Sequence, residues 1–144
     1  MTNTEMSMVS EAGSRLQQAC HSASYKAGWW HVLGFDVREF VRASHAESKL
    51  DRYFAGALVA QKICLSHSEL SEAMEGHRKG LKDDKLPHRS MLEVELADAV
   101  IRIADLAGAL DLDLGGAIAE KMAFNAQRAD HKPEARAAAG GKAY

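Results

Sequence analysis

Two pairs of acidic residues suit the binding of a positive group, because of their types and their spacing. Glu69 and Glu72 form one pair, and Glu95 and Asp98 form the other, each with a spacing of three residues. Residues three apart lie on one face of a helix, so each pair places two carboxylates side by side. Like charges on adjacent turns repel one another. Either water solvates them or a cation lies among them.

Clustered carboxylates in a partly dry site cannot all stay ionised without a counter-charge. If the helices that carry the two pairs pack side by side, the four carboxylates surround one point. Oxygen ligands without His or Cys at a matching spacing suit Mg²⁺, with Mn²⁺ as a substitute, better than zinc. The alternative is that the acids form surface ion pairs. The cations available for such pairs are Arg78, Lys79, Lys82 and Arg102.

The helix that carries the second pair is expected from about Ser90 to Leu110, and its pattern predicts burial. Apolar residues recur at spacings of four and three, as in the seam of a helical bundle. The seam is made of Leu92, Leu96, Ala99, Ile103, Leu106 and Leu110. A second apolar arc lies beside it, and a strip that contains Glu95 and Asp98 runs between the two. We therefore expect these carboxylates to face an enclosed cleft.

The rest of the chain predicts four more helices and no sheet. They are expected at about residues 10–24, 36–43, 47–79 and 113–130. Asp36 and Asp113 are candidate N-caps, Gly80 is a stop signal, and Gly56 could interrupt the third segment. β-branched and aromatic residues are too sparse to predict strands. The expected fold is all-α, a bundle of four to five helices.

Composition and charge set the class of protein. The chain has 144 residues, of which 47% are apolar and 26% charged, so it can bury a core. We expect one domain over residues 1–132, followed by a small, Gly-rich, flexible tail at 133–144. The net charge of −2 and the lack of a basic block do not indicate a nucleic-acid-binding surface.

The location of the protein is predicted from what the sequence lacks. No apolar stretch reaches the length of a membrane span, and the N-terminal segment is too polar for a signal peptide. Two cysteines, Cys20 and Cys64, form neither a disulfide framework nor a zinc set and are typical of free thiols. We expect a cytoplasmic protein, in the host cytoplasm if the chain is viral, with no membrane partner.

Three successive segments resemble the MazG-like all-α nucleotide pyrophosphohydrolases, a superfamily that also contains dCTP pyrophosphatases and dimeric dUTPases. The segments are KICLSHSELSEAMEGHRKG, EVELADAVIRIADLAGALDLDL and AIAEKMAFNAQRADHK, between Lys62 and Lys132. They contain both acidic pairs in order, followed by a K-x-x-x-N-x-x-R pattern. AGWW at residues 27–30 is similar to the aromatic stretch that often precedes the core of this family. The resemblance implies a MazG-like bundle.

The resemblance also implies an activity, namely hydrolysis of a nucleoside triphosphate between the α and β phosphates. The products are a monophosphate and pyrophosphate, and the role is control or cleaning of the dNTP pool. The implied Mg²⁺ ligands are Glu69, Glu72, Glu95 and Asp98. Glu69 and Glu72 are the candidates for accepting the proton of the attacking water, and spacing does not choose between them. Ser68 stands where many members have a further glutamate, so the number of metal ions stays open.

Cations that suit the substrate phosphates lie on the fifth expected helix. Lys121, Asn125 and Arg128 fall within about 60° on one face of it. Two cations and an amide suit the β and γ phosphates, and Lys62 adds a third cation. The alternative is a solvated polar face on a terminal helix.

The aromatic segment is the candidate for base binding. Trp29 and Trp30 are adjacent and point in different directions, so one can pack in the core while the other stacks on a base. His31 could add a hydrogen bond to the base. The alternative for His31 is a structural or exposed histidine.

The expected assembly follows from apolar area, because a fourth helix that is apolar nearly all round leaves surface that one subunit does not cover. We expect a homodimer, and the resemblance also allows a homotetramer.

Two alternative functions stay open. One is a non-enzymatic helical interaction module with solvated acids. The other is a phosphoribosyl-ATP pyrophosphohydrolase, which is less favoured because the aromatic segment suggests wider base selection.

Overall fold

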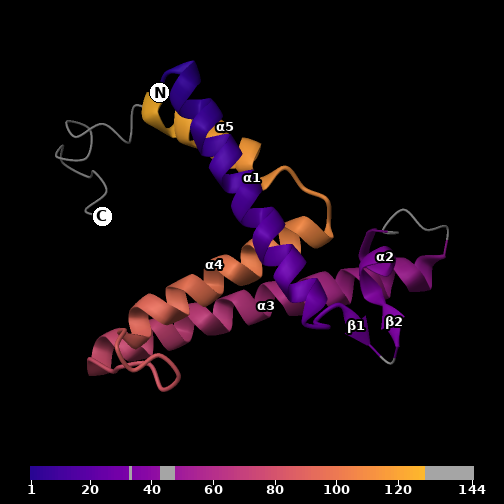
Figure 1. The fold of residues 1–144 in the computed structure, drawn as a ribbon. Helices are drawn as coiled ribbons and strands as arrows, with labels where there is room; N and C mark the ends of the chain where they lie inside the picture. The colour runs from indigo at the N-terminus through magenta and orange to yellow at the C-terminus, as the bar shows by residue number, and fades with distance from the viewer. Residues whose placement is uncertain (33, 43–47, 129–144) are drawn as a thin grey trace, which may run out of the picture. The chain divides into compact units, whose positions relative to one another are not determined.

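The structure is a computed structural model that describes residues 1–32, 34–42 and 48–128. The described residues form five α-helices and one short antiparallel β-hairpin (Figure 1). In chain order the elements are α1 (Asn3–Lys26), β1 (His31–Val32), β2 (Phe35–Asp36), α2 (Val37–Arg42), α3 (Lys49–Lys79), α4 (Met91–Ala109) and α5 (Leu114–Gln127). The mostly helical character agrees with the all-α prediction. The tail predicted at residues 133–144 lies outside the described residues.

The predicted helix boundaries hold best where a capping residue marks them. The Ser48 side chain caps α3 by accepting a hydrogen bond from the backbone of Asp51, and Gly80 ends it with φ 62°. The expected interruption at Gly56 is wrong, because α3 is one helix of 31 residues. A single helical glycine costs only about 1 kcal/mol relative to alanine, which is too little to break a long helix that packs against a neighbour.

The first helix begins earlier than predicted, at Asn3 instead of near residue 10. The Glu5 backbone N–H donates to the Thr2 hydroxyl, and the Thr2 backbone N–H donates to the Glu5 carboxylate. These reciprocal bonds form a capping box, which satisfies the exposed N–H groups of the first turn. The polar N-terminal segment is therefore helical although it has no strong apolar period.

The chain divides into two compact units. Among the described residues, the first combines residues 1–15 with residues 113–128, and the second spans Leu16–Leu112. In the first unit, the stretch of α1 around Gly13 packs closely on the first turn of α5. A Cβ atom added to Gly13 would lie only 2.7 Å from the Cα atom of Gly115. The two backbones therefore touch at a position where a larger residue does not fit.

The second unit is organised by α3 and α4, which run side by side in opposite directions (Figure 1). The connecting loop fixes their register. The buried Asp83 carboxylate accepts hydrogen bonds from the backbone N–H groups of Lys85 and Leu86. Beside this loop, a Cβ atom added to Gly76 would lie 2.8 Å from the Met91 side chain. The last turns of α3 are therefore in close contact with the start of α4. This register brings the two acidic segments to the same level.

The hydrophobic core of this unit lies at the opposite end of the helical pair. Trp30, Val41 and Ala109 are almost fully buried there. The β1–β2 hairpin was not predicted from the sequence, because its strands have two residues each. It turns through Gly34, whose φ of 84° is unfavourable for other residues. None of the described helices contains an apolar stretch that could cross a lipid bilayer.

The predicted seam of α4 is only partly correct. Ala99 is buried, but Leu96 and Ile103 are 45% and 46% exposed. The physical reason is the size of the packed residues: small alanines, such as Ala73 on α3 and Ala99 on α4, allow the helices to approach closely. The acidic strip consequently turns inward, and the larger apolar side chains remain on the outside of the single chain.

Candidate functional site

Three of the four predicted metal-binding carboxylates converge between α3 and α4. One oxygen atom from each of Glu69, Glu95 and Asp98 lies within 4.8 Å of the other two. Glu69 and Glu95 are buried, at 6% and 8% exposed, and Asp98 is half-buried. These three residues are here called the acidic cluster. Glu69 belongs to α3, and Glu95 and Asp98 belong to α4, which runs antiparallel to it. The prediction that the two acidic segments meet is confirmed for them.

The fourth predicted ligand, Glu72, is exposed at the edge of the cluster. Its charge still reaches the cluster and acts on Glu95. Burial, the adjacent carboxyl of Glu69, and the charges of Glu72 and Asp98 together raise the pKa of Glu95 to about 7. The cluster therefore has an excess of negative charge that burial makes costly. An oxygen-only donor set with this deficit of positive charge fits a hard divalent cation.

One basic side chain reaches the cluster among the described residues. Arg102 donates from its Nε atom to Oε1 of Glu69 at 2.6 Å, and this arginine is 31% exposed. Glu69 therefore has an ion pair with one of the candidate cations, although the pair is largely buried and is not the surface pair of the alternative. In the described ranges no ion pair reaches Glu95 or Asp98, so Arg102 offsets only part of the charge.

Ion pairs also form one turn further along α3, at an acid that is not among the four predicted ligands. Glu75 forms ion pairs with Arg78, at 3.6 Å, and with Lys79. The Arg78 and Lys79 side chains are well exposed and Glu75 is half-buried, so these pairs lie at the solvated surface and contribute little stability.

A cavity of about 380 Å³ adjoins the cluster within the second unit. It is lined by Ser24, Trp29, Lys62, Leu65, Lys85, Asp98, Ile101, Arg102 and Asp105. Asp98 and Arg102 connect it to the acidic cluster, since both residues belong to the lining. The lining therefore combines two carboxylates with three basic side chains, and these basic groups suit a ligand with several anionic oxygens.

Lys62, one of the predicted phosphate ligands, lines this cavity in a partly buried position. Its Nζ atom lies 4.3 Å from the centroid of the Trp30 ring and donates to the backbone oxygen of Trp29 at 3.4 Å. Burial, together with the positive charge of Arg102, lowers the pKa of Lys62, while the charge of Asp105 opposes this shift. Burial of this ammonium group carries a cost that an anionic ligand in the cavity would offset.

The two tryptophans occupy different environments, as the sequence predicted. Trp29 is 59% exposed and lines the cavity, whereas Trp30 is fully buried. His31, on β1, is exposed and its ring packs 5.0 Å from the ring of Tyr25. Of the three predicted base-binding residues, Trp29 is the one whose ring borders the cavity.

The buried Trp30 belongs to a polar network that the sequence did not reveal. Its Nε1 atom donates to both carboxylate oxygens of Asp105, at 2.8 and 3.0 Å. The Nδ1 atom of His21 lies 2.8 Å from Oδ1 of the same carboxylate. His21 and Asp105 are separated by 84 positions, and no local pattern pairs them. This Asp105 network fixes the ring that lies beneath Lys62.

The remaining predicted phosphate ligands belong to α5 in the first unit. Lys121 and Asn125 line a hollow of about 480 Å³ together with apolar residues of the same helix. The Nζ atom of Lys121 lies 4.8 Å from the Phe124 ring centroid, and Oδ1 of Asn125 is buried without a hydrogen-bond partner in the described chain. Arg128 is the C-cap residue of α5.

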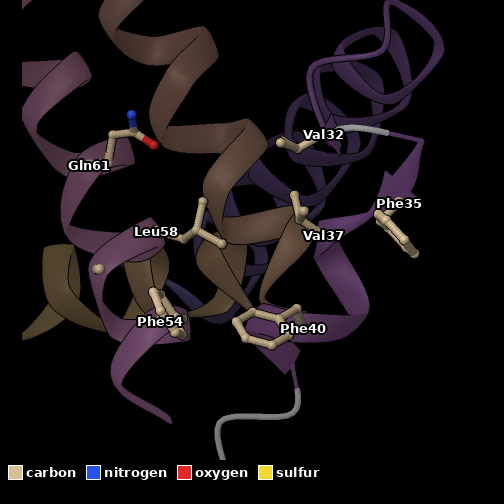
Figure 2. Close-up of a pocket in the computed structure, with 8 residues that line it drawn as sticks. Val32, Phe35, Val37, Phe40, Phe54, Leu58 and Gln61 are labelled. Carbon is tan, nitrogen blue, oxygen red and sulfur yellow. The ribbon is translucent and has the colours of Figure 1, made fainter. Parts of the chain in front are cut away.

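A second cavity in the Leu16–Leu112 unit is of a different kind. It has a volume of about 630 Å³ and lies among side chains of α2, α3 and the hairpin (Figure 2). Its lining is Val32, Phe35, Val37, Phe40, Phe54, Ala57, Leu58 and Gln61. None of these described lining residues is titratable, so they offer no group for acid, base or metal chemistry. The chemistry of this unit therefore centres on the acidic cluster.

Comparisons of the chain with protein-family models, with characterised proteins and with solved structures found no match.

Proposed function

We propose that the chain is a Mg²⁺-dependent nucleoside triphosphate pyrophosphohydrolase of the MazG-like type. It cleaves a (d)NTP between the α and β phosphates and acts in control or cleaning of the dNTP pool. The observation that carries this proposal is the convergence of Glu69, Glu95 and Asp98 beside a cavity that contains basic side chains. Resemblance of the sequence to the family supports the type of reaction.

The carboxylates have two proposed roles, metal binding and activation of water. Glu69, Glu95 and Asp98 would hold Mg²⁺, with Glu72 at the solvent side. Bound Mg²⁺ supplies neutralisation of the phosphate charge and a lower pKa for water. Glu72 and Glu69 remain the candidates for accepting the proton of the attacking water. Glu72 is exposed and accessible to water, whereas Glu69 already accepts a hydrogen bond from Arg102.

The cavity would hold the substrate. Lys62 and Lys85 neutralise phosphate oxygens there, because both basic side chains line it. Trp29 offers its exposed ring for stacking on the base. The burial of Trp30 supports a structural role for that ring, in positioning Lys62.

Further parts of the proposal rest on the family pattern. Lys121, Asn125 and Arg128 are proposed as additional phosphate ligands, and the enzyme is proposed to be a cytoplasmic homodimer or homotetramer. Exposed apolar residues on α4, Leu96 and Ile103, support a partner subunit, since covering them would remove apolar surface from water.

The direct test is Mg²⁺-dependent release of pyrophosphate from the eight common NTPs and dNTPs. We expect release from at least one, and a loss of more than about 100-fold in kcat for Glu95→Gln and for Asp98→Asn. Retained activity in both variants would remove the metal assignment. Glu93→Gln is the matched control, because Glu93 lies on the same helix and is exposed.

The role of Lys121 is tested separately. Lys121→Ala should raise KM for the triphosphate severalfold, because a cation at the phosphates contributes about 1 kcal/mol or more to binding. Lys26→Ala serves as a control at an exposed lysine. An unchanged KM would remove Lys121 from the phosphate site.

A second candidate function is a non-enzymatic helical interaction module. The ion pair of Arg102 with Glu69 favours it, because this pair neutralises one acid without a metal. The exposed apolar residues of α4 would then contact a partner protein. This candidate predicts no pyrophosphate release from any nucleotide and no effect of Glu95→Gln on partner binding.

A further inference from the structure

Arg102 stands between the acidic cluster and the cavity and belongs to both. Its Nε atom holds Oε1 of Glu69, and the residue also lines the cavity. The guanidinium carbon lies 6.0 Å from the ring centroid of Trp29, which also lines the cavity. On α4 it follows Asp98 by one turn, so both side chains leave the same face of the helix. Among the described residues it is the one basic side chain shared by the two regions.

The carboxylate of Glu69 cannot serve two cations equally well. A divalent ion bound among Glu69, Glu95 and Asp98 would bring two positive charges next to the guanidinium of Arg102. That repulsion is strong in a site where two of the carboxylates are buried. Binding of the ion therefore competes with the hydrogen bond from Arg102 to Glu69.

The cavity offers Arg102 an alternative partner when the ion arrives. The side chain is 31% exposed, so it can change rotamer without opening the packed interface of α3 and α4. A guanidinium binds phosphate oxygens through two parallel N–H groups, which makes it better suited to a polyphosphate than a lysine. Lys62 and Lys85 line the same cavity and mark where the phosphates would lie.

We propose that Arg102 is an exchangeable counter-ion: it pairs with Glu69 in the metal-free protein and binds the phosphates of the triphosphate once Mg²⁺ occupies the acidic cluster. This inference rests on the proposed function. It makes metal binding and phosphate binding positively coupled, because each favours the conformation in which Arg102 has left Glu69. Arg102 also reduces metal binding in the absence of substrate.

The test measures binding and not turnover, on the full chain. The affinity for Mn²⁺ alone is measured by titration with electron paramagnetic resonance, and the affinity for inorganic tripolyphosphate is measured at saturating Mn²⁺. We expect Arg102→Gln to bind Mn²⁺ about tenfold more tightly than the unmodified chain and tripolyphosphate about tenfold more weakly. Arg102→Lys, which keeps the charge, should bind Mn²⁺ nearly as the unmodified chain does and tripolyphosphate less tightly.

The matched control is Arg89→Gln, because Arg89 also forms an ion pair with a glutamate, Glu93, but both side chains are exposed. It should leave both affinities unchanged. If Arg102→Gln binds Mn²⁺ within twofold of the unmodified chain, or keeps its affinity for tripolyphosphate, the exchange is wrong. If Glu95→Gln binds Mn²⁺ as the unmodified chain does, the metal site itself is wrong, and the proposed function fails with it.

Discussion

Two buried carboxylates of α4 have opposite surroundings. Asp105 is 6% exposed and accepts hydrogen bonds from Trp30 at both oxygens, with His21 at one of them. Glu95 is 8% exposed and is surrounded by Glu69, Glu72 and Asp98. Among the described residues, the first acid has hydrogen-bond donors as partners, whereas the groups that act on the second are other acids. Burial alone therefore does not distinguish the two acids, whereas their partners do.

The different surroundings of Asp105 and Glu95 should affect the free energy of unfolding in opposite directions. An ionised group whose donors are built into the fold stabilises that fold, because removing it leaves the donors without partners. A group whose neighbours carry the same charge destabilises the fold until a cation arrives. Replacing the two residues should thus shift stability in opposite directions.

The largest effect is expected at Asp105. Asp105→Ala leaves the buried indole N–H of Trp30 and the ring of His21 without an acceptor, so the free energy of unfolding should fall by about 3 kcal/mol. Chemical denaturation measures this. Glu93→Ala, at an exposed acid of the same helix, should change it by less than about 0.5 kcal/mol. A loss below about 1 kcal/mol at Asp105 would show that the network is not structural.

A smaller loss is expected when one donor is removed. Trp30→Phe keeps an aromatic ring in the core but deletes the N–H group that binds Asp105. A hydrogen bond to a charged group contributes about 2 kcal/mol, so unfolding free energy should fall by about that amount. Trp29→Phe is the control, since Trp29 is mostly exposed. Equal effects of the two substitutions would contradict the assignment of separate roles.

The opposite sign is expected at the acidic cluster. Glu95→Gln removes a charge that its neighbours disfavour, so the metal-free protein at pH 8 should become more stable by about 1–2 kcal/mol. The same substitution should weaken Mn²⁺ binding. A clear loss of stability in Glu95→Gln would mean that Glu95 has a structural partner, as Asp105 does.

The pH dependence sharpens the comparison further. Because the folded pKa of Glu95 is raised to about 7 from the ordinary 4.5, its favourable contribution is present below about pH 4.5 and is lost as the pH rises through 7. As the pH rises from 4.5 to 7, the melting temperature of the metal-free chain should therefore fall relative to that of Glu95→Gln. Each kcal/mol of lost stability corresponds to a fall of about 3 °C. A constant difference between the two proteins from pH 4.5 to 8 would contradict the shift.

Much of the helical framework could be predicted from the sequence, because local residues mark it. Ser48 and Gly80 bound α3, and Ser90 caps α4. The early start of α1 was also readable, since Thr2 and Glu5 have the spacing of a capping box. The inward turn of the acidic strip was harder to predict. It depends on which row of α4 packs against α3, and alanines rather than leucines decided this.

The candidate site divides in the same way. The meeting of Glu69 with Glu95 and Asp98 follows from two short acidic repeats on neighbouring helices, and the sequence predicted it. The partners of the site did not follow from spacing. Arg102 reaches Glu69 across 33 positions, and His21 reaches Asp105 across 84. Such pairs arise from tertiary packing, which a single sequence does not reveal.

The most direct measurement is a crystal structure of the full chain with saturating Mn²⁺, in which anomalous scattering locates the ion. A Mn²⁺ peak bonded to the carboxylates of Glu69, Glu95 and Asp98, with Arg102 no longer on Glu69, is the expected result. Carboxylates without an ion among them at saturating Mn²⁺, with the pair of Arg102 and Glu69 intact, would contradict the metal centre.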